Sequence, residues 1–313
     1  MTKQGTFRVR VAAVAGAAGL LLAACSSQDP LADPTEAGGD GGDGAGGSES
    51  IVVGSQDYYS NEIIAEIYAQ ALEAGGYTVE RQFRIGQREA YVPELESGAI
   101  DLFPEYTGPL LQYWVPEVES GEAEEIYAQL AESTPDGLRV LEQSPATDQD
   151  AYMVTEEFAE RWDLTTIADL AGVTEPMTMG ANSEAESRPN GPQGLAETYG
   201  VEVDFTPIED GGGPLTVQAL VDGDVQLAII YTADPSVEEN NLVPLEDTEG
   251  LFLASHVVPV ASDAVDEEAE GIINEVSATM TGDELIALNG RSVNEELPAA
   301  QIASDWLAEN DLA

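Results

Sequence analysis

Short apolar segments alternate with amphipathic segments from residue 51 onward, and this alternation limits the folds open to the chain. The pattern predicts, in order, a strand at 51–54, a helix at 61–74, a strand at 77–83, a helix at 89–97 and a strand at 99–103. Gly75 and Gly76 follow the first helix as a stop signal. The order strand, helix, strand, helix, strand predicts an α/β fold with a largely parallel sheet.

The second half of the chain shows the same alternation of predicted strands and helices. It predicts strands at 138–143, 176–180, 201–206 and 225–231, with helical segments at 167–170, 192–199 and 215–221. The C-terminal stretch is helical in three segments, 264–280, 281–289 and 298–309. Two α/β lobes of about 100 residues each, followed by a helical tail, fit this order better than one continuous sheet.

The N-terminus has the pattern of a secretory signal peptide. Lys3, Arg8 and Arg10 precede a short apolar stretch, residues 11–24, which is too short to be read as a membrane span. The stretch ends in LLAAC, the form of a bacterial lipobox, and Cys25 is the only cysteine in the chain. We therefore expect cleavage before Cys25 and a lipid on its thiol, and the alternative is a plain signal peptide with an incidental cysteine.

Residues 25–49 are rich in Gly, Ser and Asp and contain almost no apolar side chains. Such a segment cannot offset the entropy of ordering, so a flexible tether behind the lipidated cysteine is expected. No apolar run approaching 18 residues follows it. The sequence thus predicts a soluble body outside the cytoplasm, anchored to the cell membrane by lipid.

The charge of the chain is strongly negative. Sixty acidic residues face ten basic ones, and the formal net charge is −50 at pH 7. After residue 25 the basic residues are all arginines. Nucleic-acid binding is excluded, because it requires a cationic surface. Two interpretations of the acidity remain open: a surface kept soluble in high salt, and a field that gathers cationic ligands.

The most informative motif is the run GQREAYVPELESGAIDLFPEYTG at residues 86–108. It resembles the substrate-binding proteins of osmoprotectant ABC transporters, the glycine betaine/choline (OpuAC-like) family. The resemblance extends in order over residues 50–313, through GSQDYYSNEIIAEIY at 54–68, GGPLTVQALVDGD at 212–224, YTADP at 231–235, VPLED at 243–247 and VVPV at 257–260. Departures from the family pattern stand at Ser60, Pro109, Ser255 and His256.

The resemblance implies a two-lobed periplasmic-binding-protein-like fold with a ligand cleft between the lobes. It implies a first lobe of residues 50–150 plus 252–313 and a second lobe of residues 151–251. The expected ligand is a small cationic or zwitterionic solute such as glycine betaine or choline. The expected partners are the permease subunits of an ABC transporter, to which a monomer would deliver the solute.

A quaternary ammonium group has no N–H to donate, so aromatic faces would hold it through cation–π attraction. A buried carboxylate facing such a group would carry a desolvation cost. By position and resemblance, the candidate rings are Tyr106 and Tyr231 at strand ends, Tyr152 in the crossover and Tyr58 before the first helix. For Tyr58, packing is an equal alternative.

Four polar residues are candidates for the remaining ligand contacts. Thr107 and Thr232 follow the two principal tyrosines and could bind a carboxylate or hydroxyl. Asn61 could donate to a ligand, with helix capping as the alternative. Arg88 could clamp a betaine carboxylate, and the alternative is an ion pair with Glu89 or Asp101.

Two other functions stay open at this point. The same fold could bind another solute, such as an amino acid, which would need an arginine clamp and an acidic partner. A hydrolase is the second alternative, but the chain has no G-x-S-x-G, no cysteine placed for catalysis and a single histidine, His256. We expect no catalytic residues, no metal and no cofactor.

Overall fold

The computed structural model describes residues 50–118 and 120–313. The predicted signal peptide, the lipidation of Cys25 and the predicted tether all lie outside the described residues. None of the helices in the described part of the chain is long and apolar enough to cross a membrane.

The first sheet has the strand order β2-β1-β3-β10-β4. Its strands are β1 (Ile51–Gly54), β2 (Val79–Gln82), β3 (Leu102–Tyr106), β4 (Leu138–Val140) and β10 (Val257–Ser262). We call this sheet and the helices packed on it the first lobe. Strand β10 follows all the strands of the second sheet in the sequence, so the chain leaves this lobe and returns to it.

The second sheet has the order β7-β6-β8-β5-β9. Its strands are β5 (Asp150–Thr155), β6 (Thr178–Ala181), β7 (Asp204–Pro207), β8 (Leu227–Tyr231) and β9 (Leu242–Pro244). With its helices it forms the second lobe. The two separate sheets confirm the predicted two-lobed α/β fold.

The sheets are mixed, which corrects the prediction of a largely parallel sheet. Strand β1 pairs in parallel with β2 and β3, but β10 runs antiparallel to β3 and β4. In the second sheet β6 pairs in parallel with β7 and β8, whereas β5 runs antiparallel to β8 and β9. In each sheet the antiparallel strand, β5 or β10, is the one that follows a connection between the lobes.

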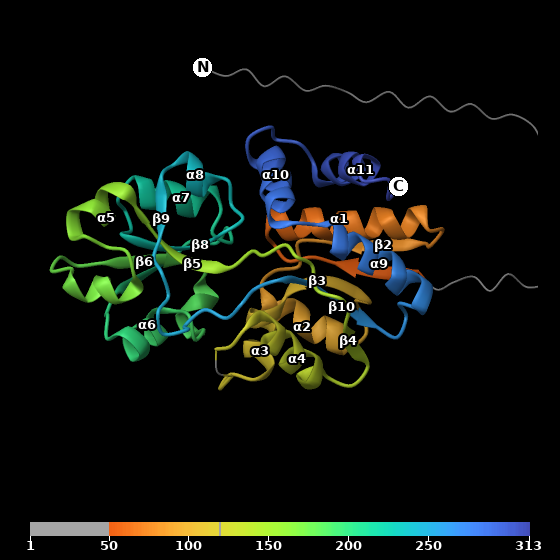
Figure 1. Cartoon of the computed structure of the whole chain (residues 1–313), viewed down its shortest axis with the longest axis horizontal. Helices are drawn as coiled ribbons and strands as arrows, with labels where there is room; N and C mark the ends of the chain where they lie inside the picture. Colours follow the sequence, from red (N-terminus) through yellow and green to blue (C-terminus); the bar gives the residue numbers. More distant parts are fainter. Residues whose placement is uncertain (1–49, 119) are drawn as a thin grey trace, which may run out of the picture. The chain divides into compact units, whose positions relative to one another are not determined.

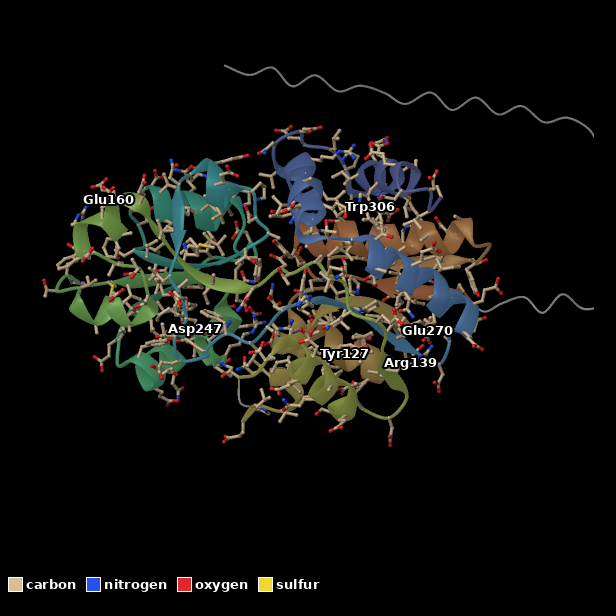
Figure 2. All side chains as sticks on the ribbon, in the orientation of Figure 1. Tyr127, Arg139, Glu160, Asp247, Glu270 and Trp306 are labelled. Carbon is tan, nitrogen blue, oxygen red and sulfur yellow. The ribbon has the colours of Figure 1, made fainter. Side chains whose placement is uncertain are left out.

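Helices cover both faces of the first sheet (Figure 1). One face carries α1 (Tyr59–Ala74), α9 (Glu267–Thr279), α10 (Gly282–Val293) and α11 (Ala299–Glu309). The other carries α2 (Arg88–Glu96), α3 (Thr107–Trp114) and α4 (Ala123–Ser133). The predicted helical tail therefore packs on this lobe, with Trp306 of α11 buried (Figure 2).

Local signals explain where the C-terminal helices begin. Asp266 accepts hydrogen bonds from the backbone N–H groups of Glu268 and Ala269 at the start of α9. Thr281 and Glu284 form a capping box at the start of α10. Each cap satisfies N–H groups that a helix cannot satisfy itself, so both helices have fixed first turns.

The second sheet is also packed on two sides. One apolar core contains residues of α5 (Glu156–Trp162), the 3-10 helices η1 (Ile167–Gly172) and η2 (Ser183–Ser187), and α6 (Pro192–Tyr199). A smaller core contains residues of α7 (Pro214–Val221), and Val237 of the short helix α8 (Ser236–Glu239) packs against it. Each lobe thus has its own apolar interior.

Two connecting segments join the lobes, one between β4 and β5 and one between β9 and β10. They pair with each other: Thr147 and His256 form an antiparallel bridge, and the Ser255 hydroxyl donates to the Asp148 carbonyl oxygen at 2.8 Å. The predicted lobe boundaries at residues 150 and 252 remain a proposal.

Candidate functional site

A cavity lies where the ends of β3 and β8 meet the connecting segments. Its walls include Tyr58, Arg88 and Tyr106 from the first lobe and Arg188 and Tyr231 from the second. It encloses about 360 Å³ of free space, counting the part that opens to solvent.

Three of the predicted aromatic rings meet in this cavity. The ring centroids of Tyr58 and Tyr231 lie 4.7 Å apart with their planes tilted by 52°. Tyr106, the last residue of β3, lines the same cavity and is 6% exposed. Burial raises the pKa of all three phenols, so each stays neutral. The hydroxyls of Tyr58 and Tyr106 have no partner among the described residues.

Arg88 lines the cavity, but its guanidinium is held by Glu105. Nε lies 2.7 Å from Oε1 and Nη2 lies 2.9 Å from Oε2. The hydroxyl of Tyr91 and the backbone N–H of Tyr106 also donate to this carboxylate, which is fully buried. The predicted alternative pairing with Glu89 or Asp101 is wrong, because β3 brings Glu105 beneath Arg88 while Asp101 bonds the backbone of β1.

Tyr152 lies elsewhere. It is fully buried in the core of the second sheet, where its ring meets Phe252 edge-on at 4.9 Å and its hydroxyl donates to the Asn190 carbonyl oxygen at 2.9 Å. Strand β5 begins at Asp150, so Asp150 lies at the cavity and Tyr152 lies about 7 Å further along the strand. The structure does not bring Tyr152 together with the other three rings.

The three remaining polar candidates bond to the protein itself. Asn61 accepts from the Gln56 N–H and donates to the Pro104 carbonyl oxygen. It therefore links the β1–α1 connection to strand β3 rather than capping α1, which starts at Tyr59. Thr107 donates to the Ala254 carbonyl oxygen. Thr232 accepts from the backbone N–H of Gln149. These side chains hold the cavity walls in place.

Sequence reasoning did not select five polar residues that line the cavity. They are Gln56, Gln87, Asp148, Asp150 and Arg188. Pro109 and Ser255, two of the departures from the family pattern, line it as well. Both aspartates stand at the entry to β5, and recognising that strand would have placed them at its cavity end.

Asp148 is the most unusual of these groups. It is 3% exposed, its Oδ1 accepts from the Ala233 N–H at 3.0 Å, and its Oδ2 has no partner among the described residues. Burial raises the pKa of this carboxyl from 3.8 to about 8. Burial also raises the pKa of Asp150, whose Oδ2 accepts from the Asn190 amide at 2.9 Å.

Several side chains join the two lobes around the cavity. Arg188 of the second lobe lies 2.8 Å from the carboxylate of Glu89 and 3.3 Å from the Gln87 amide oxygen in the first. The Tyr59 hydroxyl donates to Asp234 of the second lobe at 2.8 Å. The described residues contain no group of three His, Cys, Asp or Glu side chains placed to hold a metal ion.

Comparison with known proteins agrees with this architecture. The sequence model of the family described as "Substrate binding domain of ABC-type glycine betaine transport system" matches residues 49–309. The chain therefore belongs to this family of transporter substrate-binding domains.

Individual relatives are distant but match over most of their length. A glycine-betaine-binding protein of Pseudomonas aeruginosa is 26% identical, with 85% of this chain and 89% of that protein covered. The glycine betaine-binding protein YehZ of Escherichia coli is 24% identical, with 83% and 90% covered. A crystal structure of a glycine betaine/carnitine/choline ABC transporter protein has a TM-score of 0.68 at 19% identity, with 84% of this chain and 99% of that chain covered, and shows the same fold.

Proposed function

We propose that this protein captures a quaternary ammonium osmoprotectant, such as glycine betaine or choline, between its two lobes and delivers it to an ABC permease. The convergence of Tyr58, Tyr106 and Tyr231 from the two lobes on one small cavity carries the proposal. Family membership and the names of the relatives support it.

The physical reason is the chemistry of the trimethylammonium group. It offers no hydrogen-bond donor, and its positive charge is spread over methyl groups that fit against aromatic faces. Each desolvated ring contributes about 0.5–2 kcal/mol of cation–π attraction. Three rings contribute about 1.5–6 kcal/mol of the roughly 8 kcal/mol that micromolar binding requires, and shape fit supplies the rest.

The lobes supply different parts of this site, so closure completes it. Tyr58 and Tyr106 come from the first lobe and Tyr231 from the second. The contacts Arg188 with Glu89 and Tyr59 with Asp234 form only when the lobes are together. We propose hinge closure about the paired connecting segments as the capture step.

The remaining assignments are also part of the proposal. The protein acts as a monomer outside the cytoplasm, held to the membrane by a lipid on Cys25 and a tether over residues 25–49. It has no catalytic role. The lobes divide near residues 150 and 252.

The test is calorimetric titration of the purified chain with glycine betaine, choline, carnitine, proline betaine and ectoine. We expect saturable binding of at least one quaternary ammonium compound. Tyr106→Ala and Tyr231→Ala should each weaken it more than tenfold, and Tyr106→Phe, which keeps the ring, should retain most of it. Tyr127→Ala on α4 is the control, because that hydroxyl bonds the Leu141 carbonyl away from the cavity (Figure 2). Unchanged affinity in both alanine variants would contradict the cage.

A further inference from the structure

The cavity contains arginines and carboxylates whose charges are unequally matched. Arg88 is paired with Glu105, and Arg188 is paired with Glu89. Asp148 and Asp150 also line the cavity. Within the described residues neither aspartate lies in an ion pair with an arginine. When the two aspartates are ionised, the walls therefore carry a surplus of negative charge.

Asp148 lines the cavity near the aromatic rings. Its carboxylate is close enough to Tyr58 and Tyr106 to raise the pKa of each phenol, after burial itself. Its Oδ2 is buried and has no hydrogen-bond partner among the described residues. A cation held by the rings would compensate this oxygen without needing an N–H group to donate.

Asp150 stands opposite Tyr231 in the β5–β8 pairing and lies near Arg88 and Arg188. Burial raises the pKa of Asp150, and the positive charges of Arg188 and Arg88 partly oppose this rise. The two arginines therefore already interact with the Asp150 carboxylate. Glu105 occupies Nε and Nη2 of Arg88, and Glu89 and Gln87 occupy Nε and Nη2 of Arg188. A ligand carboxylate placed here would meet Asp150 as a like charge at short range.

We propose that Asp148 and Asp150 make this site select quaternary ammonium ligands of net positive charge with an uncharged polar tail, the chemistry of choline, over zwitterions with the same head and a carboxylate tail. This inference rests on the proposed function and specifies its ligand class. Asp148 attracts the cationic head, and Asp150 rejects a carboxylate and accepts a hydroxyl.

The discriminating experiment is titration with choline and glycine betaine, which share the trimethylammonium head and differ at the tail. In the unaltered chain at pH 8 we expect choline to bind at least tenfold more tightly than glycine betaine. Asp148→Asn should weaken choline more than tenfold and should weaken glycine betaine too, because both ligands carry the head that Asp148 attracts. Asp150→Asn should strengthen glycine betaine and reduce the ratio between the two ligands.

The matched control is Asp222→Asn, which removes one exposed carboxylate of the second lobe outside the cavity. It separates the local effect from the field of a chain with net charge −50. At 1 M salt the Debye length is only about 3 Å, so a preference set by the acidic surface should vanish. A preference set by the two cavity aspartates should persist, and Asp222→Asn should leave it unchanged.

The outcomes separate this inference from the proposed function. Equal or tighter binding of glycine betaine, with a ratio that neither asparagine variant changes, would overturn the inference and leave the proposed function standing. Absence of binding by every quaternary ammonium compound would overturn both. Thermal unfolding of each variant shows whether a lost affinity reflects a lost fold, and a folded Asp150→Asn keeps the test decisive if Asp148→Asn does not fold.

Discussion

Two arginines line the cavity, and they are held in different ways. Arg88 bonds to Glu105 inside the first lobe, with side chains that are 10% and 0% exposed. Arg188 reaches from the second lobe to Glu89 in the first, with side chains that are 21% and 43% exposed. The Arg88–Glu105 pair lies within one lobe, so this wall of the cavity forms when that lobe folds; we call it the preformed wall. The Arg188–Glu89 pair belongs to the contact between the lobes. The comparison separates what folds the site from what closes it.

The largest effect should come from breaking the preformed wall. Glu105→Gln leaves the Arg88 charge buried without its counter-charge, and loss of one partner of a buried pair costs about 3–5 kcal/mol. Glu89→Gln breaks a partly exposed pair and should cost about 1 kcal/mol or less. Urea unfolding of the two variants measures both values. Equal losses would show that the pairs do not differ in kind.

Asp148 lies on the segment that joins the two regions, and its pKa predicts a pH dependence of binding. The titratable groups near it are two aspartates, Asp150 and Asp234, and four tyrosines, Tyr58, Tyr59, Tyr106 and Tyr231. A bound cation favours the ionised carboxyl, so a proton is released when the ligand binds below pH about 8. Choline affinity should therefore rise from pH 6 to 8, by up to about tenfold per pH unit, and then level off.

Calorimetry in buffers of different ionisation enthalpy counts the released proton. The raised pKa also predicts that the free energy of unfolding falls as the pH rises, because the folded protein binds this proton more tightly than the unfolded chain. Asp148 makes its full contribution to the free energy of unfolding below pH about 4, and this contribution is lost as the pH rises toward 8. Asp148→Asn should flatten both profiles, and a pH-independent affinity in the unaltered chain would contradict the assignment.

A pair of tyrosine–aspartate hydrogen bonds sharpens the comparison further. The Tyr59 hydroxyl donates to Asp234 across the lobes at 2.8 Å, and the Tyr77 hydroxyl donates to Asp266 within the first lobe at 2.7 Å. Tyr59→Phe removes a bond of the closed form and should lower ligand affinity by roughly 10- to 150-fold, since such a bond is worth about 1.5–3 kcal/mol. Tyr77→Phe should leave affinity unchanged. Equal effects in a titration would deny Tyr59 a role in closure.

The smallest effect should come from an exposed pair far from both regions. Arg139 and Glu270 lie 3.2 Å apart, link β4 to α9 and are about one-third exposed (Figure 2). Arg139 also donates to the carbonyl oxygens of Ser262 and Val265, so it stays in place without the glutamate. Glu270→Gln should cost about 0.2–1 kcal/mol in thermal unfolding and leave binding unchanged. A larger loss would mean that α9 depends on this charge.

Local signals predicted many elements well. Helix α6 has its predicted bounds, because Pro192 suits a first helical position and Gly200 adopts the left-handed conformation that ends it. Strand β8 ends at Tyr231 as expected. Helix α3 was not predicted, since it follows β3 directly, contains Gly108 and Pro109 and has no capping side chain.

The site was harder to predict than the fold. Arg88 and its partner Glu105 are 17 residues apart, so their contact depends on how α2 packs on β3. Tyr152 lies outside the cavity because strand β5 begins at Asp150 and carries residue 152 away from it into the core. The pattern of residues 143–150 carries no strong periodicity, and Asp148 acquires its character only from the buried environment that both lobes create.

The central claim is that the rings bind a cation rather than an apolar shape. Titration with choline and with 3,3-dimethylbutan-1-ol, which replaces the ammonium nitrogen by carbon, tests it most directly. We predict saturable binding of choline and affinity for the carbon analogue that is lower by at least a hundredfold, about 2.7 kcal/mol. Equal affinity for the two compounds, or binding of the alcohol alone, would contradict the account.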